Sequence, residues 1–86
     1  MKAEAGEWVK ALAESLGVAP LTERQKERLL SVSRRVAHGV ERAATPLSAY
    51  LVGMGVAAKV ADGVDPETAF DQVIDRLLEL LPPESP

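Results

Sequence analysis

The fold is decided by residues 45–66, which read TPLSAYLVGMGVAAKVADGVDP. The pair Thr45-Pro46 predicts a helix start, with Thr45 as the N-cap residue and Pro46 in the first turn. Apolar residues then occupy nearly every side of the helix as far as about Asp62, and Gly63 predicts its end. Because a helix that is apolar all round is typical of a buried one, we expect this helix to lie at the centre of the fold.

Both sides of this helix are built from aliphatic residues. One side carries Leu47, Leu51, Met54, Ala58 and Ala61, and the other carries Ala49, Val52, Val56 and Val60. The small residues Ala49, Gly53, Ala57 and Ala61 recur at four-residue steps, which predicts close approach of a neighbouring backbone. In a chain with only 3% aromatic residues, we expect Met54 to belong to the core, and Tyr50 and Trp8 to be large core fillers whose polar tips reach outward.

Two further helices are predicted before this central one. The first spans about residues 2–16 and ends at Gly17, a residue suited to a left-handed C-cap. The second begins at Thr22, where Gln25 three residues later completes a capping-box pattern. Its apolar face consists of Leu29, Val32, Val36 and Val40.

A last helix is predicted to begin at Asp65-Pro66, again an N-cap residue followed by proline, and to end at Pro82-Pro83. Its buried stripe is predicted to be Phe70, Val73, Ile74, Leu77, Leu78 and Leu81, with Asp71, Asp75 and Glu79 facing water. No segment alternates with period two, so the prediction is an all-α fold, a small four-helix bundle with the third helix central. We expect one domain over residues 1–81 and a disordered tail over 82–86.

Composition narrows the classes of function. The 86 residues carry a formal net charge of −3, which argues against a general nucleic-acid binder. The absence of cysteine excludes disulfides and thiolate metal sites and fits a cytoplasmic protein. The most apolar run, residues 47–60, is shorter than the roughly 20 residues of a transmembrane helix, and residues 1–7 lack the apolar centre of a signal peptide. We therefore expect a soluble protein without a membrane partner.

The sequence contains no recognisable catalytic or metal-binding constellation. His38 is the single histidine, and Ser31 and Ser33 share its helix without an identifiable orienting acid. Asp62 and Asp65 are explained as helix-end residues. We expect no enzymatic activity, no cofactor and no metal site.

A basic stripe on the second helix is the most informative polar feature. At about 100° per residue one side of this helix carries Arg24, Arg28, Ser31, Arg35, His38 and Arg42, flanked by Arg34. Guanidinium groups favour bidentate contacts with carboxylates and phosphates, so the stripe indicates an acidic protein surface or a phosphate-bearing ligand. The alternative is a solvated helix face balanced by Glu23, Glu27 and Glu41, and the sequence leaves both interpretations open.

One segment also resembles a known family. Residues 35–42, RVAHGVER, followed by Pro46-Leu47 and Leu51-Val52-Gly53, resemble a small all-helical domain of unknown function that is widespread in actinobacteria. In that family an AHGV-R segment leads into a P-L-x-x-x-L-x-G helix and follows an N-terminal helix with a tryptophan, as at Trp8. The similarity covers residues 7–77. It departs at Ala43-Ala44, where the family has a proline.

In some relatives that domain is fused to, or encoded near, a nucleotidyltransferase-type protein of molybdopterin-guanine dinucleotide biosynthesis. The resemblance thus implies a link to molybdenum-cofactor maturation, and it draws attention to Arg35, His38 and Arg42. Three functions follow as hypotheses. The first is a non-catalytic accessory or interaction module that uses Arg28, Ser31, Arg35, His38 and Arg42. The second is a self-associating homodimer, and the third a small nucleic-acid-binding regulator, which the acidic charge disfavours.

Overall fold

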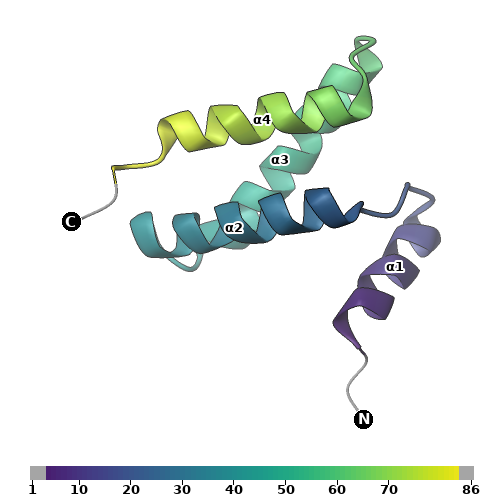
Figure 1. The fold of residues 1–86 in the computed structure, drawn as a ribbon, viewed down its shortest axis with the longest axis horizontal. Helices are drawn as coiled ribbons and strands as arrows, with labels where there is room; N and C mark the ends of the chain where they lie inside the picture. The colour runs from purple at the N-terminus through teal and green to yellow at the C-terminus, as the bar shows by residue number, and fades with distance from the viewer. Residues whose placement is uncertain (1–3, 84–86) are drawn as a thin grey trace.

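The computed structural model describes residues 4–83 as four α-helices, with no strand among those residues. The helices are α1 (Ala5–Leu16), α2 (Glu23–Gly39), α3 (Ala44–Ala61) and α4 (Pro66–Leu80). Figure 1 shows α3 crossing behind α2 and α4, and α3 contacts both of them. The all-α prediction with the third helix at the centre is confirmed.

Three of the four helix starts follow from local capping. Thr22 Oγ1 accepts a hydrogen bond from the Gln25 amide at 3.1 Å, and the Gln25 side chain accepts one from the Thr22 amide at 2.9 Å, so the capping box is confirmed. Asp65 caps α4 through the Thr68 amide, with Pro66 as the first helical residue. Helix α1 begins at Ala5 behind the N-cap residue Glu4. The expected start at residue 2 lies outside the described residues.

The predicted N-cap of α3 is wrong. Helix α3 begins at Ala44, and its N-cap residue Ala43 forms no side-chain cap. The amides of Ala44 and Thr45 already donate to the carbonyls of Glu41 and Arg42 in the preceding turn, so the helix needs no hydroxyl at this point. Thr45 Oγ1 is instead buried without a hydrogen-bond partner among the described residues.

Glycine ends two of the helices as predicted. Gly17 (φ 70°) and Gly63 (φ 94°) both adopt the left-handed conformation that disfavours residues with a Cβ atom. Helix α4 ends at Leu80, just before Pro82-Pro83. The predicted disorder of residues 84–86 lies outside the described residues.

The core lies between α2, α3 and α4. Its buried members are Val32, Val36, Val52, Phe70 and Ile74. These positions belong to the apolar faces predicted for the three helices, although Val40, at the end of α2, is exposed.

Helix α3 is central but is not enclosed, which corrects the prediction that it is buried. Only Val52 among its residues is buried, whereas Met54 is exposed and the Tyr50 side chain is 72% exposed. Two neighbours can cover only one side of a helix, so the other side of α3 faces solvent. Trp8 on α1 is also 56% exposed, so neither of these aromatic residues fills the core.

The close backbone approach predicted for the strip of small residues does not occur at its glycine, Gly53. A Cβ atom placed on Gly53 would meet nothing within 4 Å, whereas one on Gly55 would lie 3.4 Å from Val73 of α4. Gly55 is therefore in van der Waals contact with the Val73 side chain, whereas Gly53 has open space beside it.

Helix α1 stands apart from the other three helices. Figure 1 shows it beside the start of α2, joined by an extended link over residues 17–22. None of its Cα atoms lies within 8 Å of another helix among the described residues. The three-helix core therefore forms without α1.

By length and composition alone, α3 could cross a membrane, since its mean hydropathy over 18 residues is 1.2. A helix of that length spans about 27 Å, slightly less than the ~30 Å hydrocarbon core of a bilayer. One side of α3 also packs on α2 and α4, whose ion-paired side chains would have to enter the bilayer with it. Helix α3 therefore qualifies as a possible span by length and apolar composition alone.

Candidate functional site

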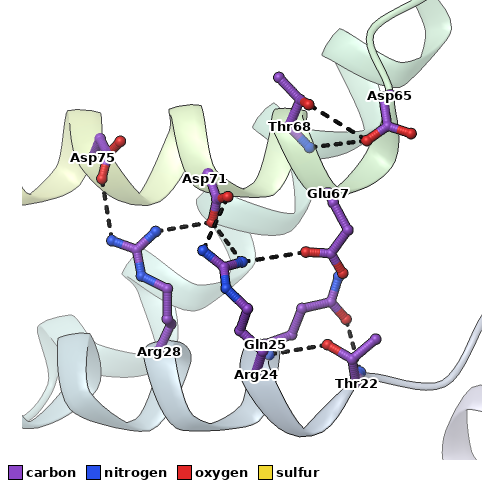
Figure 2. A network of polar contacts seen from close by, with 9 residues as sticks. All are labelled: Thr22, Arg24, Gln25, Arg28, Asp65, Glu67, Thr68, Asp71 and Asp75. Atoms are coloured by element: carbon purple, nitrogen blue, oxygen red, sulfur yellow. Dashed lines mark hydrogen bonds and ion pairs between the residues drawn. The ribbon is translucent and has the colours of Figure 1, made fainter.

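The first half of the basic stripe is engaged by α4. Arg24 contacts Oε2 of Glu67 at 3.3 Å and Oδ1 of Asp71 at 2.9 Å. Arg28 donates from Nη1 to Asp71 at 2.9 Å and from Nη2 to Asp75 at 3.1 Å. Figure 2 shows both guanidinium groups converging on Asp71. We call these five residues the α2–α4 clasp.

The clasp corrects the expectation that Asp71 and Asp75 simply face water. Hydrogen bonds from Arg24, with a smaller contribution from Arg28, hold the pKa of the Asp71 carboxyl below its ordinary value. The hydrogen bond to Asp71 in turn raises the pKa of Arg24. The charges of the two helices therefore stabilise each other in the ionised form.

Arg28, a predicted binding residue, thus has its guanidinium shared between two carboxylates of α4. Its side chain is only 28% exposed. A partner that binds Arg28 would have to compete with Asp71 and Asp75. The geometry assigns Arg24 and Arg28 a structural contact and leaves the rest of the stripe as the candidate site.

The second half of the stripe forms what we call the basic end of α2: Ser31, Arg34, Arg35, His38 and Arg42. The first four of these residues surround a hollow of about 590 Å³, closed on the other side by residues 81–83. Ser31, Arg34 and His38 are exposed, and Arg35 is half-buried. The structure therefore brings together three of the predicted residues, namely Ser31, Arg35 and His38.

Arg42 lies outside this hollow. It follows the end of α2, in the turn before α3, and is exposed. Arg34, which the sequence places only on the flank of the stripe, takes its position at the hollow instead. Neither Arg34 nor Arg42 has an ion-pair partner among the described residues.

The basic end offers binding chemistry rather than an assembled reaction centre. Ser31 and His38 lie seven residues apart on one helix, about 10.5 Å along its axis, which is too far for a direct nucleophile–base hydrogen bond. No group of three or more histidine or carboxylate side chains that could hold a metal ion occurs among residues 4–83. A cationic hollow of this kind suits a carboxylate or phosphate group.

A second surface lies on a side of α3 that was predicted to be apolar and buried but is exposed. Leu47, Leu51, Met54 and Ala58 of α3 form an exposed apolar stripe, which we call the α3 stripe. It adjoins a groove of about 980 Å³, whose lining includes Leu51 of α3, Val73 and Leu80 of α4 and Val36 of α2. The spacing of four, three and four residues is that of a helix-pairing seam, which makes the stripe visible in the sequence but does not show whether it is covered.

Comparison with known proteins identifies the family of this chain but assigns it no activity. No curated protein and no solved structure matches the sequence. A family model does match residues 1–85, which is nearly the whole chain. The chain therefore belongs to the family described as Domain of unknown function (DUF6457).

Proposed function

We propose that this chain is a non-catalytic interaction module whose basic end docks an acidic protein surface. The observation that supports the proposal is the gathering of Ser31, Arg34, Arg35 and His38 around one hollow. Arginine side chains held close together around one hollow bind an anionic group more strongly than the same charges scattered over a surface. A free phosphate-bearing ligand would be bound through the same arginine contacts as an acidic protein surface, and the experiment below includes a test for it.

The division of the stripe supports the same proposal. The clasp neutralises Arg24 and Arg28 through Glu67, Asp71 and Asp75. Basic charge is consequently concentrated at one end of α2 in a chain whose formal net charge is −3. Such an asymmetry favours a partner with a complementary acidic patch, bound in a fixed orientation.

The resemblance described above names a first partner to test. We propose a role in the cytoplasm, in molybdenum-cofactor maturation, with the nucleotidyltransferase of molybdopterin-guanine dinucleotide biosynthesis as that partner. Support comes from the RVAHGVER segment, which contributes Arg35, His38 and Arg42 to the basic end.

The test is a calorimetric titration of the nucleotidyltransferase with the wild-type chain and with Arg35→Glu/Arg42→Glu. We expect the double variant to bind at least about tenfold more weakly at low salt, because two charges reverse in the contact. The matched control is Arg76→Glu, which reverses an exposed charge on α4. Equal binding by all three chains would show that the basic end does not contact the nucleotidyltransferase. Competition by inorganic pyrophosphate would indicate a phosphate ligand.

Self-association is a second candidate function, favoured by a separate observation. The α3 stripe is uncovered in the single chain, and so are Trp8, Leu12 and Leu16 of α1. Small domains with thin cores gain stability when such faces are covered by a partner subunit.

A further inference from the structure

Two apolar stripes on this chain lack a covering element. The first is the α3 stripe, in which Leu51 is 64% exposed. The second, which we call the α1 stripe, consists of Trp8, Leu12 and Leu16. Each lies on a regular helix, and neither helix presents its stripe to the core of α2, α3 and α4.

The total surface of the chain measures how much is uncovered. The chain exposes 6637 Å², whereas a compact monomer of its mass, 9.2 kDa, exposes about 4,900 Å². This excess of about 1,700 Å² per copy is summed over all 86 residues, of which the stripes are one part, and it exceeds the roughly 1,000 Å² per copy that a stable homodimer buries at the lower end of its range. The radius of gyration also indicates an open arrangement of helices. It is 13.8 Å, whereas a compact chain of this length has a radius of about 12 Å.

The two stripes match in length and pattern. Helix α1 has 12 residues and is therefore about 18 Å long, and the α3 stripe from Leu47 to Ala58 extends about 16 Å. Both stripes recur at steps of three or four residues, the pattern by which one helix packs along another. Glu7, Lys10 and Glu14 lie on the side of α1 opposite the α1 stripe and would remain in water when the stripe is covered.

We propose that a second copy of this chain covers these stripes, with α1 of each copy packed along the α3 stripe of the other. The inference rests on self-association, the second candidate function above. Reciprocal exchange gives a symmetric, closed dimer in which both uncovered stripes disappear together. It also supplies each three-helix core with a fourth helix.

Covering within one chain is disfavoured by the length of the link. Residues 17–22 join α1 to the start of α2 and span at most about 20 Å. The residues of the α3 stripe are turned about 100–160° around α3 from Val52, which faces the core. To reach that side the link would have to pass α3, which is about 10 Å across and lies a further 8–10 Å from the axis of α2.

Disulfide trapping tests the exchange, and the natural chain contains no cysteine to interfere. One chain carries Leu12→Cys, and a second chain with a different tag carries Leu51→Cys. After mixing and mild oxidation, we expect a disulfide between the two tags. Lys10→Cys replaces Leu12→Cys in the control, because Lys10 lies on the opposite side of α1. We expect at least about a tenfold lower yield from the control pair.

Light scattering separates this inference from self-association itself. We expect a dimer at high micromolar concentration, and Met54→Lys should weaken it about tenfold or more because a charge enters the covered stripe. Gly53→Lys is the control, since it places the same charge on another side of α3 in open space. A monomer at that concentration overturns both proposals. A dimer without the Leu12–Leu51 cross-link overturns the exchange alone.

Two other occupants of the stripes would also overturn the exchange. The double variant Leu12→Cys/Leu51→Cys would give an intramolecular disulfide in a monomer if α1 covered its own α3. Flotation with phosphatidylcholine vesicles, lost in Met54→Lys, would instead indicate a lipid surface. We expect neither result.

Discussion

Arg28 donates a hydrogen bond from Nη1 to Oδ1 of Asp71 at 2.9 Å, and this contact joins the middle of α2 to α4. The same carboxylate oxygen lies 2.9 Å from Nη1 of Arg24. Asp71 therefore holds two cations of one helix and sets the position of α2 along α4 (Figure 2). The contact also decides which part of the basic stripe α4 engages, namely Arg24 and Arg28.

Replacement of the shared carboxylate should lower stability. In Asp71→Asn both guanidinium groups lose their common anion, and we expect a lower melting temperature by circular dichroism. The difference should narrow in about 1 M salt, because exposed charges are screened. Glu79→Gln is the control, since it removes one exposed contact with Arg76 within α4. An equal loss in both variants would show that the clasp has no special role.

The clasp should also make stability depend on acidity. The pKa of Asp71 is lower in the folded chain than its ordinary value, so its contribution is present above the unfolded pKa and lost as the pH falls. We expect the difference between wild type and Asp71→Asn to shrink below about pH 4. Urea unfolding of both chains at a series of pH values measures this difference in the free energy of unfolding. A difference that persists under strongly acidic conditions would contradict the ion-pair explanation.

Replacement of two glycines by alanine should change the free energy of unfolding in opposite directions. Gly53 lies within α3 with nothing near its missing Cβ atom, so Gly53→Ala should stabilise the fold by about 1 kcal/mol. Gly63 has a φ of 94°, and Gly63→Ala should destabilise it by about 1 kcal/mol. Chemical denaturation measures both changes. Destabilisation by Gly53→Ala would mean that this side of α3 is covered.

Two threonines near helix starts should also differ. Thr22→Ala removes a capping box and should cost about 1 kcal/mol in the free energy of unfolding. Thr45→Val removes a buried hydroxyl that has no hydrogen-bond partner among the described residues, so it should be neutral or stabilising by up to about 1 kcal/mol. Equal destabilisation by both changes would indicate that Thr45 caps the start of α3 after all.

The core should be sensitive at its most buried position. Ile74 is fully buried, and Ile74→Val should cost about 0.5–1.5 kcal/mol in the free energy of unfolding. Leu80, which is 79% exposed, serves as the control, and Leu80→Ala should change the stability of the monomer by less than about 0.5 kcal/mol. Urea titration compares the two. A larger loss from Leu80→Ala would show that the α3–α4 groove is occupied in solution.

Helix boundaries were predicted well where the chain carries its own capping chemistry. The Thr22–Gln25 pair, Asp65-Pro66 and the two positive-φ glycines all act within a few residues of themselves. The start of α3 was predicted wrongly because the helix begins earlier, at Ala44, directly after a turn in which the amides of Ala44 and Thr45 donate to the carbonyls of Glu41 and Arg42. A turn of this kind leaves little trace in the sequence.

The candidate site was predicted only in part. The basic side of α2 follows from helical periodicity, and the structure gathers Ser31, Arg35 and His38 at one hollow. The pairing of Arg24 and Arg28 with α4 could not be predicted, because their partners are more than 40 positions away in the sequence and meet them only after the helices pack.

The sequence by itself determined that this protein is all-helical, where most of its helices begin and end, and which residues form the apolar face of each helix. Those properties depend on contacts between near neighbours along the chain. Only the tertiary structure decided which apolar residues are enclosed and which cations are neutralised. Helix α3 is apolar on almost every side, yet just two helices cover it, because burial depends on how many neighbours pack around a helix.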